Sequence, residues 1–163
     1  LQQKARLLLQ EPGEYILGNT VYEEVFYLQS KKEKRAKAQI NLEYLQVFGI
    51  PSSKAYVYPE HISGGERQQV ALAAALESLP EILLLDEPML GIDAEGRGRF
   101  QELLRALKGR MTIIYVTHDW TEVSQLADEV WLLKKGQVAY KWQREKEQKE
   151  IDPELLKEAG VRC

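Results

Sequence analysis

The sequence predicts an α/β fold with a parallel sheet, and three observations lead to this prediction. Two apolar runs, EILLLDEP (81–88) and MTIIYVTHD (111–119), have the length and composition of strands, and a helical pattern follows each of them. A third run, ARLLLQ (5–10), is a shorter strand ahead of a helical region. Strands that alternate with helices favour a parallel sheet. Because both long runs are continuously apolar, we expect them to be buried on both faces.

Composition limits the classes of partner. The chain has 163 residues and a formal net charge of −3, so one domain with its own core is possible. This charge gives no general attraction to nucleic acid or to an anionic membrane, and no nucleic-acid partner is expected. The only cysteine is Cys163, so no internal disulfide can form. No apolar run approaches the ~20 residues that span a bilayer.

The first sixty residues predict a strand, a loop and helices. Pro12, Gly13 and Gly18 break the segment 11–19, which is therefore a loop. Thr20, with Glu23 three residues later, fits the start of a helix over TVYEEVFYLQ. A second amphipathic helix is predicted over 31–49, and we interpret its initial charged run as a solvated face.

The remaining elements follow from the same rules. Asp152 and Pro153 have the residue types that begin a helix, so the tail is predicted to be helical. The full prediction comprises helices over 63–79, 94–107 and 121–127, two short strands around Lys135-Gly136, a solvated charged segment over 141–150 and a tail helix over 152–161. We divide the chain into a strand and loop (1–19), a helical subdomain (20–62), a catalytic core (63–140) and a charged segment with the tail helix (141–163).

Two glycines stand where the helix over 63–79 begins. Ser63 and Glu66 fit a capping box, in which the serine hydroxyl and the glutamate carboxylate bond each other's backbone N–H. Capping accounts for these two residues but not for Gly64 and Gly65, which disfavour a helix. A helix N-terminus with its side chains removed lets an anion approach the free N–H groups. Both interpretations, a plain cap and a phosphate site, remain open at this point.

Acidic and imidazole groups end the two long strands. Asp86 and Glu87 stand at the carboxyl end of the first, where α/β sheets bind ligands. One carboxylate there can hold Mg²⁺ and the other can polarise a water molecule. The alternative interpretation is that Asp86 only caps the following turn. His118 ends the second strand, and a lone histidine is more often structural. If the strands are neighbours, His118 and the two acids share one edge, with Gly91–Asp93 as a turn between them.

In this order the motifs resemble the nucleotide-binding domain of ABC ATPases, which are P-loop NTPases. ISGGE (62–66) resembles the signature motif, and ILLLDE (82–87) resembles Walker B with its catalytic glutamate. Gly91–Asp93 resembles the D-loop, Thr117-His118 the switch-histidine loop, and Gln10 the Q-loop glutamine. The fifth signature residue departs from the family, because glutamine is commoner there than Glu66.

The resemblance implies residue roles in a head-to-tail dimer that binds ATP and Mg²⁺. Ser63, Gly64 and Gly65, with Glu66 beside them, would contact the γ-phosphate of ATP held by a second ABC ATPase domain. Asp86 and Gln10 would organise Mg²⁺. Glu87 would act on the attacking water, and His118 would contact the water and the γ-phosphate; both roles are catalytic. Asp93 would communicate across the dimer.

A narrower similarity joins QEPGEYILGNTVYEEV (10–25) and the tail ELLKEAGV (154–161) to ATPases of energy-coupling-factor and cobalt-type importers. It implies import of a micronutrient or metal ion. It also implies an integral membrane subunit docked near 11–30 and a peripheral location on the cytoplasmic face of the membrane.

No Gly-Lys pair occurs in the sequence, so the Walker A pattern is absent. We expect an N-terminally incomplete domain that is inactive alone, and we expect exposed apolar sheet surface that favours self-association. A gene split between two polypeptides is an alternative account of the missing motif. Two other functions stay open: a soluble ABC-type ATPase of translation or DNA maintenance, and a nucleotide-incompetent fragment that only binds a partner.

Overall fold

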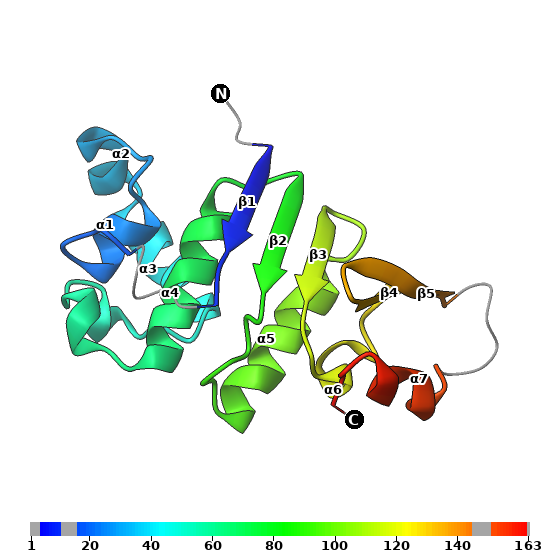
Figure 1. Ribbon diagram of the computed structural model, residues 1–163. Coiled ribbons are helices and arrows are strands. Elements are labelled where there is room, and N and C mark those ends of the chain that lie inside the picture. Colours follow the sequence, from blue (N-terminus) through cyan, green and yellow to red (C-terminus); the bar gives the residue numbers. More distant parts are fainter. Residues whose placement is uncertain (1–3, 11–15, 145–150, 163) are drawn as a thin grey trace. The chain divides into compact units, whose positions relative to one another are not determined.

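The computed structural model describes residues 4–10, 16–144 and 151–162, and it divides the chain into two compact units (Figure 1). The first unit covers Leu1–Val116 and the second Thr117–Cys163. The fourfold division made from the sequence remains a prediction.

A parallel sheet is the centre of the first unit, as predicted. Its strands β1 (Ala5–Leu8), β2 (Ile82–Asp86) and β3 (Thr112–Val116) lie in the order β1-β2-β3. β2 therefore pairs with both of the others, and Asp86 is in register with Val116. The neighbouring positions of β2 and β3, which the sequence left conditional, are confirmed. Their carboxyl ends meet at the same edge of the sheet.

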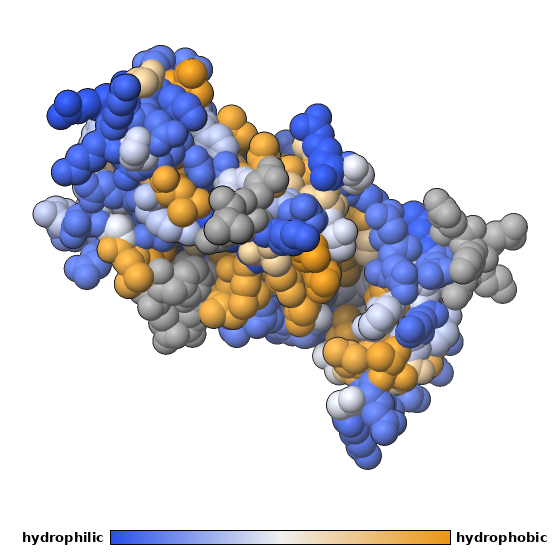
Figure 2. Space-filling model, turned by 90° about the horizontal axis from the view of Figure 1, so that it is seen from above, coloured by the Kyte–Doolittle hydropathy of each residue, from blue (hydrophilic) through white to orange (hydrophobic). Residues whose placement is uncertain are grey.

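Burial of the sheet on both faces was predicted, and that prediction is wrong for this chain. Side chains alternate along the strands, with Leu8, Leu83 and Leu85 at most 1% exposed on one face. On the other face Leu7 and Ile114, which flank Leu84 in register, are 54% and 48% exposed. Helix α4 packs against β1, and no element of the described residues covers the opposite face. Hydrophobic side chains gather in the middle of the view in Figure 2, which agrees with the prediction of exposed apolar surface.

The helical subdomain is more divided than predicted. Its helices are α1 (Val21–Val25), α2 (Lys31–Ala36) and α3 (Ala38–Val47), with 3₁₀ turns η2 (Ser52–Lys54) and η3 (Pro59–His61). The single helix predicted over 31–49 breaks at Lys37, whose backbone φ of −103° and ψ of 11° depart from helical geometry. The helix predicted over 20–29 ends at Val25, although Thr20 caps it as expected.

Buried polar contacts hold this subdomain together. Asn41 is only 3% exposed, and its side-chain amide donates to the Tyr22 hydroxyl at 2.7 Å and to the side-chain Oε1 of Gln29 at 2.9 Å. Because buried polar groups are costly without partners, this network fixes one arrangement of α1 and α3. α1 in turn packs against α4.

Two longer helices of the first unit match the sequence prediction closely. α4 covers Gly64–Glu77, and Ser63 is its N-cap. α5 covers Ala94–Leu107, and Asp93 is its N-cap. Both helices therefore begin with a side-chain oxygen that accepts a hydrogen bond from their first turn.

The second unit contains α6 (Trp120–Val123), β4 (Glu129–Lys134), β5 (Gln137–Gln143) and α7 (Pro153–Glu158). The predicted strands around Lys135-Gly136 and the tail helix are confirmed; both turn residues have positive φ, as a tight hairpin needs. α6 is shorter than the predicted helix. The prediction of a solvated segment over 141–150 is wrong for its first residues. β5 continues to Gln143, and Trp142 is only 5% exposed in the core of the unit. The rest of that segment, 145–150, lies outside the described residues.

Within the described residues, no helix has the length and apolar content to cross a membrane.

Candidate functional site

The start of α4 forms the capping box that the sequence suggested. The Glu66 N–H donates to Ser63 Oγ at 3.2 Å, and the Ser63 N–H donates to Glu66 Oε2 at 3.0 Å. The serine hydroxyl also donates to Glu66 Oε2 at 3.2 Å. These bonds satisfy the N–H groups of Ser63 and Glu66, while the N–H groups of Gly64 and Gly65 have no acceptor among the described residues.

The structure does not need glycine at either position. Neither Gly64 nor Gly65 has a positive φ. A Cβ at Gly65 would lie 3.6 Å from the Gly91 carbonyl oxygen, which is an ordinary contact, and one at Gly64 would come no closer than 4.0 Å to the Arg67 side chain. Alanine therefore fits both positions and is the better helix former. Local structure explains Ser63 and Glu66 but leaves the glycines to be explained by something that approaches the helix end.

A pocket of about 490 Å³ opens at this helix end. It combines the start of α4 with the turn before α5, so that Asp93 faces the same space as the glycines. The Asp93 carboxylate also accepts from the Gly96 N–H at 2.8 Å, which is its capping role. The full lining is Gly49, Ser63, Gly64, Gly65, Glu66, Gln69, Gly91, Ile92, Asp93 and Arg99.

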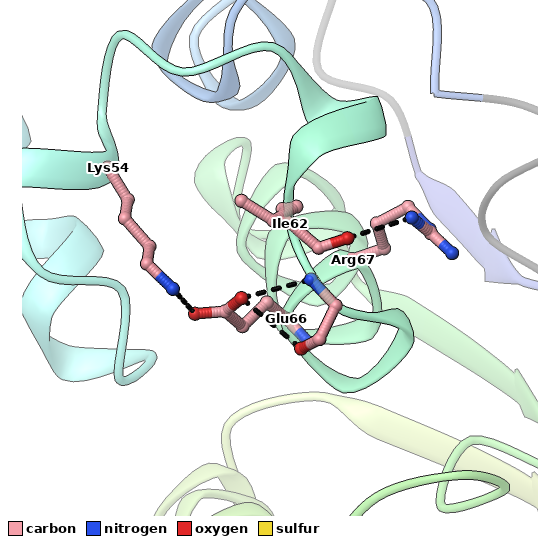
Figure 3. A network of polar contacts seen from close by, with 5 residues as sticks. Lys54, Ile62, Glu66 and Arg67 are labelled. Atoms are coloured by element: carbon pink, nitrogen blue, oxygen red, sulfur yellow. Dashed lines mark hydrogen bonds and ion pairs between the residues drawn. The ribbon is translucent and has the colours of Figure 1, made fainter.

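Lys54 reaches the same helix end from the helical subdomain (Figure 3). Its ammonium group donates to Glu66 Oε1 in a short ion pair. This hydrogen bond is the main reason why the pKa of the Glu66 carboxyl lies below its ordinary value, and the bonds from Ser63 lower that pKa further. The carboxylate is thus held in its charged form, with acceptor bonds on both oxygens.

The carboxyl end of β2 carries the two acids, and Glu87 has an unusual backbone. Its φ is +46°, a left-handed conformation that non-glycine residues rarely adopt. The Glu87 N–H donates to the Val116 carbonyl oxygen at 2.9 Å, so β3 holds this bend in place. Such strain occurs preferentially at functional sites. Gln10 follows the end of β1, so it leaves the sheet at the same edge.

His118 lies two residues beyond β3, in the second unit, and its placement relative to the acids is not determined. Its loop is well tied within that unit. The Arg162 N–H donates to the His118 carbonyl oxygen at 2.7 Å. The Thr117 hydroxyl donates to the carboxylate of Glu122, which is only 6% exposed, at 2.8 Å.

The Asp86 carboxylate at the end of β2 has the chemistry to hold a magnesium ion when an anion supplies the other ligands. Among the ranges that the structure describes, no cluster of three or more potential metal-ligating side chains is present. A magnesium ion bound with phosphate oxygens needs only one or two carboxylates from the protein. Asp86 alone meets that lower requirement, which leaves Glu87 available for another role.

Sequence reasoning placed Ser63, Gly64, Gly65 and Glu66 in one motif and Asp93 in another, and the structure brings all five to one pocket. It missed Lys54, which lies twelve residues before its partner and belongs to no motif. It also missed the contributions of Arg99 and Gln69 to the lining. The left-handed backbone of Glu87 had no sequence signal either, because nothing but the fold imposes it.

An acid-ended parallel sheet beside a helix whose N-terminal N–H groups are open defines an α/β protein of the nucleotide-binding class. The family model described as "ABC transporter" matches residues 1–90. The chain belongs to the ABC transporter family, and its fold is that of an ABC ATPase domain.

Curated relatives agree with this assignment. The chain is 42% identical over 109 residues to a probable sulfate/thiosulfate import ATP-binding protein of Chlorella vulgaris, which covers 66% of this chain and 44% of that protein. It is 32% identical over 147 residues to a putative ABC transporter ATP-binding protein of Methanosarcina mazei, covering 88% and 51%. An Fe(3+) ions import ATP-binding protein of Pasteurella multocida is 40% identical, with 69% and 32% covered. The chain thus spans about a third to a half of these relatives.

Solved structures give the same fold. A dimeric ATP-binding cassette, MJ0796, bound to ADP and Pi, matches with a TM-score of 0.74 and 28% identity, covering 87% of this chain and 63% of that one. The protein cbiO1 of Clostridium perfringens, described as part of the ABC transporter complex cbiONQ, matches with a TM-score of 0.69 and 26% identity, covering 85% of this chain and 56% of that one.

Proposed function

We propose that this chain is part of an ABC transporter ATPase that hydrolyses ATP in a head-to-tail dimer to drive import of a micronutrient or metal ion. The observation that carries the proposal is the start of α4. There Gly64 and Gly65 present N–H groups without acceptors to a pocket that the fold itself does not require to be free of side chains. A nucleotide phosphate is the group that suits such a helix end.

The residue roles proposed here follow from the family resemblance, and the arrangement at the start of α4 supports them. Ser63, Gly64 and Gly65 would bind the γ-phosphate of ATP held on a second ABC ATPase domain, with Glu66 and Asp93 beside them. The structure of MJ0796 with ADP and Pi is dimeric, which supports a two-domain site. Asp93 would sense the partner from the turn that precedes α5.

Asp86 and Glu87, at the edge of the sheet, would act on a nucleotide bound at the half-site to which β2 belongs. Asp86 and Gln10 would hold Mg²⁺, which neutralises phosphate charge when bound. Glu87 would orient and deprotonate the attacking water from the left-handed bend at the end of β2. His118 would donate to the γ-phosphate from the second unit.

The proposed partners include an integral membrane subunit docked near 11–30, which places the chain at the cytoplasmic face of the membrane as a peripheral protein. The complex named for cbiO1 supports such a partner, and the named substrates of the relatives are inorganic ions. Membership of the energy-coupling-factor or cobalt-type group rests on the 10–25 and 154–161 segments. Copurification of the intact protein with a membrane subunit supports this proposal; an intact protein that stays alone contradicts it.

The first experiment is isothermal titration with MgATP, on this chain alone and after mixing with a domain that carries Walker A. We expect no binding by the chain alone, and ATP turnover in the mixture that Gly65→Ala abolishes. Tight binding by the chain alone overturns the assignment of roles. No turnover in the mixture, together with nucleotide-independent association, favours instead a fragment that only binds a partner.

A further inference from the structure

The pocket at the start of α4 holds more negative charge than a phosphate site tolerates easily. Two carboxylates, those of Glu66 and Asp93, line it. Arg99 also lines the pocket, but its guanidinium group pairs with Glu95 one turn earlier on α5. A negative charge beside a helix N-terminus competes with an incoming anion for the same positive potential. Something must offset the Glu66 charge if a nucleotide phosphate is to bind here.

Lys54 is the group placed to do so. Its ammonium group donates to Glu66 Oε1. The Ser63 N–H and the Ser63 hydroxyl donate to Glu66 Oε2 at 3.0 and 3.2 Å. In Figure 3 the lysine extends from its own segment to the carboxylate at the first turn of α4. Lys54 is not among the residues that line the pocket, so it acts on the pocket only through Glu66.

We propose that Lys54 is a positioning residue of the phosphate site: by pairing with Glu66 it offsets the carboxylate charge, and so leaves the N–H groups of Gly64 and Gly65 able to attract a nucleotide phosphate. The inference rests on the proposed function and deepens it. It also explains how this chain carries a glutamate where the family more often has glutamine: the lysine makes the pair neutral, as glutamine is.

Stability alone does not account for the pair. The Lys54 and Glu66 side chains are 41% and 25% exposed, and ion pairs of such exposure stabilise a fold by little. The capping box does not require the charge either, because glutamine caps this position as well as glutamate does. Glu66→Gln therefore removes the charge and keeps the cap, which makes a clean test possible.

The experiment measures MgATP-dependent association of the full chain with a complete ABC ATPase domain by sedimentation velocity. Four proteins are compared: the parent, Lys54→Met, Glu66→Gln and the double variant. Lys32→Met is the matched control, because it removes the same charge from the exposed surface of α2. Far-UV circular dichroism and urea midpoints confirm that each variant folds.

We expect Lys54→Met to weaken the association about two- to fivefold, the effect of one charge near a helix end, and Lys32→Met to leave it unchanged. Adding Glu66→Gln to Lys54→Met restores the affinity, and the deficit of Lys54→Met shrinks as salt is raised. An unaffected Lys54→Met variant, or a double variant as weak as Lys54→Met, overturns the inference. A parent that shows no MgATP-dependent association overturns the proposed function as well, so the two failures are distinguishable.

Discussion

The glycines at the start of α4 give the sharpest prediction, because function and stability change in opposite directions. Gly65→Ala places a methyl group 3.6 Å from the Gly91 carbonyl oxygen, where it fits without displacing any atom. Alanine restricts the unfolded chain and favours the helix, which stabilises the fold by about 0.4–1 kcal/mol. For a chain of this size that corresponds to a rise in melting temperature of about 1–4 °C. The methyl group also occupies the approach to two open N–H groups, so MgATP-dependent association is lost.

The matched control is Gly109→Ala. Gly109 also has open space around its Cβ position, but its φ is +76°, and alanine in that conformation costs about 1–2 kcal/mol. Urea denaturation is followed by far-UV circular dichroism, since all three tryptophans belong to the second unit. If Gly65→Ala destabilises the protein as Gly109→Ala does, the glycine has a structural role. If it stabilises the protein and association with MgATP persists, phosphate does not approach there.

Three further predictions concern other parts of the first unit. Gly18→Ala places a Cβ 2.6 Å from the backbone nitrogen of Glu24, so it lowers the free energy of unfolding by about 1–3 kcal/mol; an unchanged urea midpoint contradicts this. Ile114→Thr on the exposed sheet face reduces self-association in sedimentation equilibrium, and equal association of variant and parent refutes that face as the contact. The pKa of Glu66 is lower in the folded protein, so its ion pair stabilises the fold at pH values above the unfolded pKa. This contribution is under about 1 kcal/mol and is lost as the pH falls through the folded pKa. NMR titration of the carboxyl should show that Lys54→Met raises the pKa of Glu66.

Part of the site was predictable because its signals are local. A capping box needs only the residues from Ser63 to Glu66, and both α4 and α5 begin where their capping residues stand in the sequence. The acids at the end of β2 were equally predictable, since a buried strand that ends in two carboxylates is a local pattern. The meeting of Asp93 with the start of α4 in one pocket was not predictable from spacing.

The division of the helix predicted over 31–49 and the exposed face of the sheet had to come from the structure. An amphipathic pattern is the same whether or not the helix breaks at one residue. Lysine is an ordinary helix former, so the residue type of Lys37 does not predict the break there. The apolar run of β3 predicts burial, but burial depends on which elements cover the sheet. Among the described residues none covers the face that carries Leu7 and Ile114.

The sequence by itself determined the α/β class, the order of the motifs, the residues that cap α4, and the family resemblance that the comparisons confirm as the ABC transporter family. These features depend on residues close together in the chain, where spacing controls hydrogen bonding and periodicity. Only the tertiary structure decided that Gly64 and Gly65 are dispensable for packing, that Glu87 is held in a left-handed conformation by β3, and that Lys54 pairs with Glu66. Those facts depend on atoms that distant segments bring together, and no local pattern encodes such contacts.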